Sequence, residues 1–182
     1  TARKMEKITY EEMLEMASLG TKVLQTRAVE LAMKTNQRLH VRSSYSDAPG
    51  TLVVDEDEIV EHEMVSGIAY SRDEAKITLV QVADKPGVAA SIFGPLADAG
   101  INVDMIVQNV SADGQATDLT FTVTEADLER AVETVAVKKD TLEYADLVSD
   151  SNVVKISVIG VGMRSHAGVA QRMFETLAGK GI

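Results

Sequence analysis

The chain lacks cysteine altogether and is poor in aromatic residues, with three phenylalanines and four tyrosines among 182 residues. Without cysteine it cannot form disulfides or use a thiolate in catalysis, which fits a reducing compartment. It also lacks any stretch that is long and apolar enough to span a bilayer, and no basic and apolar signal segment opens it. We therefore expect a cytoplasmic protein that has no membrane partner.

Basic residues are scarce relative to acidic ones. The chain has 18 lysines and arginines against 28 aspartates and glutamates, for a formal net charge of -10. This charge repels a phosphate backbone. An RNA-binding sheet would also need exposed aromatic and basic side chains, of which the predicted strands offer Phe121 and little else. We expect no nucleic-acid partner.

Motifs for metals and phosphates are missing as well. His40, His62 and His166 have no spacing typical of a metal site or of a nucleophile with its base, and His166 stays a candidate only through the loop that contains it. The sequence contains no glycine-rich phosphate-binding loop. The acidic run at 55–63 is interpreted as solvated surface near a domain boundary. We expect no metal site and no bound cofactor in this chain.

What the chain does contain is an internal repeat. Residues 76–101 return as residues 155–182, and from Gly87 and Gly168 onward the two copies align without a gap. A repeat this dense indicates one supersecondary unit used twice. The second copy stops after its first strand and helix, so we expect the chain to be a piece of a longer protein.

The first copy predicts a complete small domain. A β-branched strand at 76–82 breaks at a loop, and the helix that follows has apolar residues at the spacing of one buried face. Two further strands, a second helix and a fourth strand at 142–148 complete the order β-α-β-β-α-β. This order describes a ferredoxin-like α+β sandwich. The apolar residues of the first helix are Ala89, Ile92, Phe93, Leu96 and Ala97.

The first sixty residues predict a different unit. Thr9 and Glu12 have the form of a capping box before a helix over residues 10–18. A second helix follows, and then a strand at 39–43 meets a hairpin partner at 51–54 beyond a Pro-Gly turn. The second helix has its apolar residues at Leu24, Ala28, Leu31 and Ala32.

The loop before the first helix of the repeat carries the strongest chemical signal. Asp84, Lys85, Pro86 and Gly87 lead into a helix whose free amides and dipole favour a carboxylate, while Asp84 offers a partner to an amine. Together these features suit a zwitterionic amino acid. An ordinary turn followed by a helix cap explains the same residues, so both interpretations stay open. Polar residues at the next strand ends are equally consistent with hairpin hydrogen bonding and with ligand contact: Gln108, Asn109, Ser111, Thr117 and Asp118.

Three segments, taken in order, resemble the bacterial aspartate kinase family. Residues 77–90 and 101–111 are similar to its first ACT domain, and residues 155–169 are similar to its second. The segment before them resembles the end of the amino-acid-kinase catalytic domain. The resemblance divides the chain into 1–60 as the closing kinase segment, 61–75 as a linker, 76–149 as a first ACT domain and 150–182 as the start of a second.

The resemblance implies a regulatory function. Enzymes of that family phosphorylate the side-chain carboxylate of aspartate with ATP and magnesium, and their paired ACT domains bind end products, commonly lysine and threonine, and thereby inhibit the kinase domain. ATP and magnesium would belong to the parent enzyme, because the nucleotide-binding motifs of the family lie before Thr1. We expect no catalytic residues and no kinase activity in this chain alone. The incomplete second ACT domain would leave an open sheet edge that favours self-association.

The resemblance also implies an effector site. Amides at the helix start would hold the effector carboxylate, and Asp84 or Asp118 would hold its amine. A stand-alone ACT sensor or a dimerisation module for another protein is the alternative, and the kinase-like segment argues against it. Carried over by position, the effector-binding residues are Asp84, Lys85, Pro86, Gly87, Val88 and Ala89 in the loop, Gln108, Asn109, Ser111, Thr117, Asp118 and Thr120 in the pocket wall, and Met163, Ser165 and His166 on the facing domain.

Overall fold

The structure, a computed structural model, describes residues 4–59, 64–110, 116–164 and 167–182. The contacts within the chain separate it into two units, one of residues 72–155 and one of residues 1–71 together with 156–182. The finer division predicted from the resemblance, into 1–60, 61–75, 76–149 and 150–182, stays a prediction.

The unit of residues 72–155 contains one antiparallel sheet. Its strands are β5 (Ala75–Ala83), β6 (Ile106–Val110), β7 (Ala116–Val123) and β8 (Asp146–Asp150). They lie in the order β6-β7-β5-β8, so the first and third strands of the unit are neighbours at the centre.

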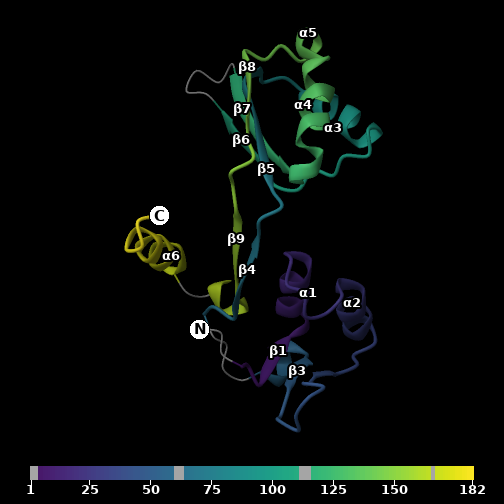
Figure 1. The fold of residues 1–182 in the computed structure, drawn as a ribbon, viewed down its shortest axis with the longest axis vertical. Coiled ribbons are helices and arrows are strands. Elements are labelled where there is room, and N and C mark those ends of the chain that lie inside the picture. The colour runs from purple at the N-terminus through teal and green to yellow at the C-terminus, as the bar shows by residue number, and fades with distance from the viewer. Residues whose placement is uncertain (1–3, 60–63, 111–115, 165–166) are drawn as a thin grey trace. The chain divides into compact units, whose positions relative to one another are not determined.

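Helices cover one face of this sheet (Figure 1). They are α3 (Val88–Asp98), α4 (Leu128–Ala136) and the short α5 (Lys139–Leu142). Since α3 connects β5 to β6 and α4 connects β7 to β8, the two crossovers are those of the split β-α-β sandwich. The ferredoxin-like fold class predicted from the repeat is confirmed. The fourth strand begins later than predicted, because Leu142 belongs to α5.

Alternation along the strands determines which side chains reach the helices. On β7, Leu119 and Phe121 are buried against the helices, and they face Leu79 and Ile77 of β5. Phe93 of α3 packs edge-on against Phe121, with the ring centroids 5.4 Å apart. The buried core of this unit comprises Ala75, Ile77, Leu79, Val82, Ile92, Leu96, Ile101, Leu119, Phe121, Val123, Ala131, Val135, Leu142 and Tyr144.

The buried face of α3 differs from the predicted stripe. Ile92 and Leu96 are buried as predicted, but Ala89 and Ala97 are exposed. The face that meets the sheet includes the partly buried Val88, four residues before Ile92. Ala89 and Ala97 lie on the neighbouring i, i+4 line, about 100° around the helix, where only the larger Phe93 between them packs against the core. The predicted stripe was therefore too wide by these two alanines.

The other unit begins with a small three-stranded sheet. Its strands lie in the order β1 (Lys7–Thr9), β3 (Thr51–Val54) and β2 (Leu39–Val41). The predicted hairpin between β2 and β3 is confirmed as an antiparallel pair, and β1 joins β3 in parallel. Two helices, α1 (Tyr10–Ser18) and α2 (Thr26–Lys34), pack with this sheet around Ile8, Tyr10, Met13, Val29, Ala32 and Val53.

The two helices of this unit test the sequence patterns differently. The capping box of α1 is present in both directions: the Thr9 hydroxyl accepts from the Glu12 amide, and the Glu12 carboxylate accepts from the Thr9 amide. On α2, however, Leu31 is 63% exposed and the buried residues are Val29 and Ala32. The predicted stripe is confirmed at Ala32 and at Leu24, which packs partly buried against this core. It was wrong at Ala28 and Leu31, which are exposed, because α2 begins only at Thr26 and its buried face includes Val29.

A two-stranded ribbon completes this unit. Its strands, β4 (Gly67–Ser71) and β9 (Lys155–Ile159), pair with each other (Figure 1). A short helix, η3 (Val161–Arg164), follows β9, and α6 (Val169–Ala178) follows it. Within the part of the chain that the structure describes, no helix has the length and apolar character needed to cross a membrane.

Candidate functional site

The approach to the candidate site is a bulge in β5. The pairing of β5 with β7 slips between Leu79 and Val82, and Gln81 in the slip has a φ of 54°. The amide of Gln81 donates to Oδ1 of Asp118 at 2.9 Å, which holds the bulge in place. Because the bulge inserts one residue, Val82 returns to the helix-covered face opposite Thr117. The bulge therefore places the side chain of Val82 on the helix-covered face, two residues before the loop begins at Asp84.

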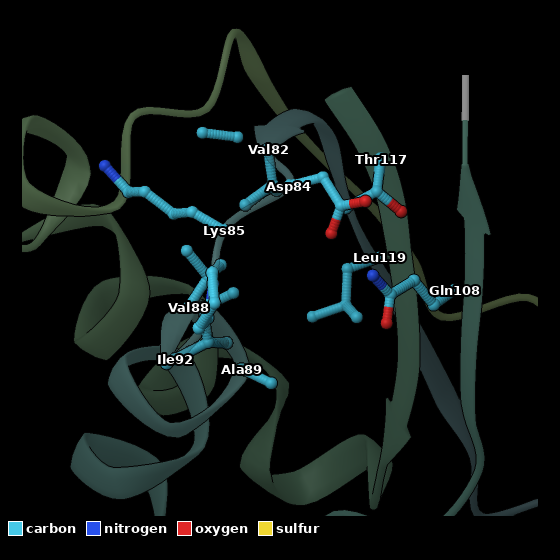
Figure 2. Close-up of a pocket in the computed structure, with 12 residues that line it drawn as sticks. Val82, Asp84, Lys85, Val88, Ala89, Ile92, Gln108, Thr117 and Leu119 are labelled. Carbon is cyan, nitrogen blue, oxygen red and sulfur yellow. The ribbon is translucent and has the colours of Figure 1, made fainter. Parts of the chain in front are cut away.

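A pocket of about 480 Å³ lies where this loop meets α3 and the sheet. Figure 2 shows Asp84 on the same side as Thr117 and Gln108, with Leu119 and Val88 forming apolar walls. The residues that line the pocket are Val82, Ala83, Asp84, Lys85, Pro86, Gly87, Val88, Ala89, Ile92, Gln108, Thr117 and Leu119.

The first turn of α3 points amide groups toward this loop. Gly87 is the N-cap residue, in the left-handed region with a φ of 91°, and no side chain caps the helix. The amide of Val88 donates to the carbonyl of Lys85, and the amide of Ser91 donates to Gly87. In the described ranges, the amides of Ala89 and Ala90 have no acceptor. They are thus available to an anion, as helix starts commonly are.

The two charged side chains of the pocket have different directions. Lys85 turns away from the pocket, as Figure 2 shows, and its Nζ pairs with Oε2 of Glu143 at 2.7 Å. Asp84 points toward Thr117 and Gln108. The pocket therefore combines one carboxylate, two uncapped amides and apolar walls, which is a set that complements a small molecule with an amine, a carboxylate and an aliphatic part.

The second copy repeats the same helix start. Gly168 is the N-cap of α6 with a φ of 97°, and the amide of Arg172 donates to its carbonyl at 3.1 Å. In the first copy the amide of Ser91 donates to Gly87 at 3.0 Å. Glycine recurs because a left-handed N-cap is unfavourable for residues with a Cβ atom. The predicted repeat is thus confirmed at the level of backbone conformation.

Eight of the predicted effector residues line the pocket, and three that the structure describes in the same unit do not. The side chains of Asp118 and Thr120 lie on the opposite face of the sheet, since they alternate with the buried Leu119. Asn109 pairs with Asp118 across the strands and lies on that face too. The eight lining residues are Asp84, Lys85, Pro86, Gly87, Val88, Ala89, Gln108 and Thr117.

The remaining predicted residues cannot be assigned to the pocket. Met163 lies in η3 of the other unit. Ser111, Ser165 and His166 lie outside the described residues. Four further residues line the pocket that were not predicted as site residues: Val82, Ala83, Ile92 and Leu119. Ile92 was predicted only as core. The signals that could have found Ile92 and Leu119 are the position of Ile92 one helical turn after Val88 and the place of Leu119 opposite Gln108.

Potential metal ligands do not cluster in the described part of the chain. It contains no group of three or more histidine, aspartate and glutamate side chains that could hold a metal ion. The chain's independence of ATP and magnesium stays a prediction.

Comparison with known proteins decides the family. A family model described as an ACT domain matches residues 77–138 and 156–182, which are the two copies of the repeat. The aspartokinase of Pseudomonas aeruginosa is 53% identical over 183 residues, which include all of this chain. A crystal structure of aspartokinase alpha and beta subunits is 45% identical, with a TM-score of 0.59, and the match covers 65% of this chain and 76% of that one.

The chain belongs to the aspartate kinase family. Within it, the chain corresponds to the regulatory portion that contains ACT domains. The ligand-free regulatory subunit of aspartate kinase from Thermus thermophilus is 33% identical, with a TM-score of 0.59, over 65% of this chain and 78% of that one. The chain spans 44% of the length of the Pseudomonas aeruginosa aspartokinase. The family and the fold expected from the resemblance are therefore confirmed.

Proposed function

We propose that this chain is the sensor of an aspartate kinase, and that it binds an end-product amino acid, lysine or threonine, in the pocket beside Gly87. The single observation that supports this most is the arrangement of opposite partners around one pocket. The uncapped amides of Ala89 and Ala90 attract a carboxylate, and the carboxylate of Asp84 attracts an ammonium group.

The walls of the pocket suit the rest of such a ligand. Val88, Ile92 and Leu119 offer apolar surface to an aliphatic side chain, while Gln108 offers hydrogen bonds to a polar end. The hydroxyl of Thr117 donates to the carbonyl of Asn109 at 3.0 Å, so it can serve a ligand only as an acceptor. Lys85 does not compete for the ligand carboxylate as long as it is paired with Glu143. Lysine and threonine present the same amine and carboxylate, so the choice between them depends on these walls.

The proposal includes the activity of the parent enzyme. Phosphorylation of aspartate with ATP and magnesium belongs to the kinase domain, for which this chain supplies a sensor and no catalytic group. Bound effector inhibits the kinase only if it binds one conformational state better than the other.

Self-association is the second part of the proposal. Strand β6 lies at an edge of the sheet, and its apolar residues Ile106, Val107 and Val110 are exposed. An exposed apolar edge strand is a ready partner for another copy. The similarity to a structure of aspartokinase alpha and beta subunits supports a partner of the same family.

The proposed pocket is tested by calorimetric titration of lysine, threonine and methionine, singly and in pairs, into the 182-residue chain. Asp84→Asn should weaken binding about tenfold or more, because a charge-assisted hydrogen bond contributes about 1.5–3 kcal/mol. Asp118→Asn is the matched control, since it removes the same charge on the opposite sheet face and keeps an oxygen for Gln81.

The two variants separate the two predicted amine partners. Unchanged binding by Asp118→Asn with weakened binding by Asp84→Asn supports the pocket. Weakened binding by Asp118→Asn alone would move the amine to the other face of the sheet. If a folded wild-type chain binds none of the amino acids, the proposed effector site is wrong.

A further inference from the structure

The carboxylate of Glu12 does more than cap α1. Its Oε2 accepts the Thr9 amide at 3.3 Å, while its Oε1 accepts the backbone amide of Val161 at 3.0 Å and the hydroxyl of Ser66. The residue is only 4% exposed. One buried carboxylate thus joins the start of α1 to two segments that lie far away in the sequence.

Those two segments flank the same end of the β4–β9 ribbon. Ser66 directly precedes β4, and Val161 follows β9 by two residues. The amide of Ser66 also donates to the carbonyl of Ile159 at 2.8 Å, which closes the ribbon there. Glu12 therefore holds the closed end of the ribbon rather than one strand alone.

The same face of α1 follows the ribbon further. A Cβ atom built on Gly67 would lie 2.9 Å from Cε of Met16, and one built on Gly20 would lie 3.6 Å from the carbonyl oxygen of Tyr70. Glu12 and Met16 are four residues apart and share one face of α1. Gly20 lies beyond the end of the helix, in the turn after the C-cap Leu19, with a φ of 104°. The ribbon is consequently in contact with α1 and with the turn that follows it, and Glu12 is the polar end of this contact.

The ribbon is also the covalent route to the pocket-bearing unit. Strand β4 ends at Ser71, after which the chain enters the unit of residues 72–155, and β9 begins at Lys155, where the chain leaves it. Strand β5 then runs to Ala83, directly before the loop of the candidate site. Both chain crossings between the two units therefore pass through the ribbon that Glu12 holds.

We infer that Glu12 is a positioning residue that couples the ribbon to α1, and that it transmits a change at the effector pocket to the N-terminal segment. The coupling of ribbon and α1 stands on the contacts of Glu12. The transmission rests on the proposed function, because it requires an effector in the pocket.

The physical reason is that one buried carboxylate, that of Glu12, accepts hydrogen bonds from the start of α1 and from the ribbon end at the same time. If the ribbon end moves away, the Glu12 carboxylate loses the donors of Ser66 and Val161. Keeping a charged carboxylate buried without these donors is unfavourable in free energy, because the lost hydration is no longer compensated by hydrogen bonds. The carboxylate then has to turn toward solvent, which withdraws it from the Thr9 amide as well. The capping box of α1 and the closed ribbon end thus form or break together.

Hydrogen–deuterium exchange on the full 182-residue chain tests the coupling. Ser66→Ala removes one donor and leaves the capping box residues in place. It should raise the amide exchange rates of residues 10–18 about fivefold or more, which is the factor that corresponds to the lower end of usual coupling free energies. Thr9→Ala removes the acceptor of the Glu12 backbone amide and keeps the Thr9 amide, whose hydrogen bond the Glu12 carboxylate accepts. It loosens the helix turn that carries Glu12, so it should raise exchange at the amide of Val161 as well.

Thr35→Ala is the matched control. Its hydroxyl donates to the carbonyl of Leu31 at 2.8 Å at the end of α2, away from Glu12. It should leave exchange in residues 10–18 and at Val161 unchanged. Unchanged exchange in residues 10–18 of Ser66→Ala, or equal rises in Thr35→Ala, would overturn the coupling.

Glu12→Gln provides a second variant. A glutamine has one acceptor oxygen, so it can satisfy either the Thr9 amide or the ribbon end, but not both. Because glutamine also suits a capping box, the chain should stay folded. We expect faster exchange at one of the two sites, and unchanged exchange at both would contradict the inference.

Lysine and threonine serve as probes for the transmission. In the wild-type chain, a bound probe should slow exchange in residues 84–92 and change it in residues 10–18. In Ser66→Ala the first change should remain and the second should fall by at least about fivefold. An equal response of residues 10–18 in both proteins would overturn the transmission. If neither probe slows exchange in residues 84–92, the proposed function and the transmission fail together, and the ligand-free comparison still decides the coupling.

Discussion

Asp118 accepts a hydrogen bond from the backbone amide of Gln81 at 2.9 Å, on the sheet face that lies opposite the pocket. This bond holds the one bulge of β5, and the bulge decides that Val82 faces α3. An aspartate that was expected to meet a ligand amine is therefore occupied in shaping the pocket from behind.

Asp118→Ala should destabilise the chain by about 1 kcal/mol, because the amide of Gln81 loses its acceptor in a residue that already has a positive φ. Asp118→Asn should stay within about 0.5 kcal/mol of wild type, since its oxygen can accept the same bond. Urea denaturation of both variants measures the difference. Equal stabilities of the two variants would show that the bond does not contribute.

Gly87→Ala and Gly168→Ala should each cost about 1 kcal/mol of stability. Both glycines have a positive φ, and a Cβ atom on either meets no atom within 4 Å, so the cost comes from backbone strain and not from a clash. Denaturation of the two variants gives the values. A cost well above this in either variant would indicate a contact that the open space around the glycine does not predict.

Lys155→Met should destabilise the unit of residues 72–155 by about 2–3 kcal/mol. Lys155 pairs with Glu74 at 2.7 Å and with Asp104, and the side chain of Glu74 is only 9% exposed. The substitution leaves the carboxylate of Glu74 buried without its cation. Adding Glu74→Gln to Lys155→Met should restore about half of the loss, and the absence of any recovery in thermal melts would count against an unpaired buried charge.

Alkaline pH should unfold the protein partly through Tyr10. Burial, followed by the charges of Glu58 and Asp55, raises the pKa of the Tyr10 hydroxyl above its usual 10. The stability from this group is complete below the unfolded pKa of about 10 and is lost as the pH rises through the higher folded pKa.

Tyr10→Phe removes this dependence. Because the hydroxyl is buried without a hydrogen-bond partner among the described residues, we expect stability at pH 7 to be unchanged or higher by up to about 1 kcal/mol. Between about pH 10 and pH 11 the free energy of unfolding should fall less for the variant than for the wild type. A steeper loss in the variant, seen by denaturation at each pH, would contradict this assignment.

The candidate site was predictable in part. The order of strands and helices predicted the sheet, and the helix start at Gly87 was recognisable because proline and glycine in a loop before an apolar stripe mark such a turn. Thr120 was assigned to the pocket even though its neighbours Leu119 and Phe121 indicated the buried face. The alternation in β7 already contained the information that would have excluded it.

Other features were beyond local patterns. Half of the stripe predicted for the second helix, Ala28 and Leu31, is exposed because the position at which a helix begins depends on packing as well as on residue spacing. The pairing of Lys85 with Glu143 joins residues 58 positions apart, and no pattern in the sequence indicates that this lysine turns away from the pocket.

By itself, the sequence determined what depends on near neighbours: the capping box of Thr9 and Glu12, the left-handed glycines of the two copies, and the alternation that divides β7 between two sheet faces. Only the tertiary structure decided that the second oxygen of Glu12 meets Ser66 and Val161, which lie 54 and 149 positions away. The physical reason is that a cap is closed within one helical turn, whereas the donors available to a buried carboxylate depend on which distant segments the fold brings beside it.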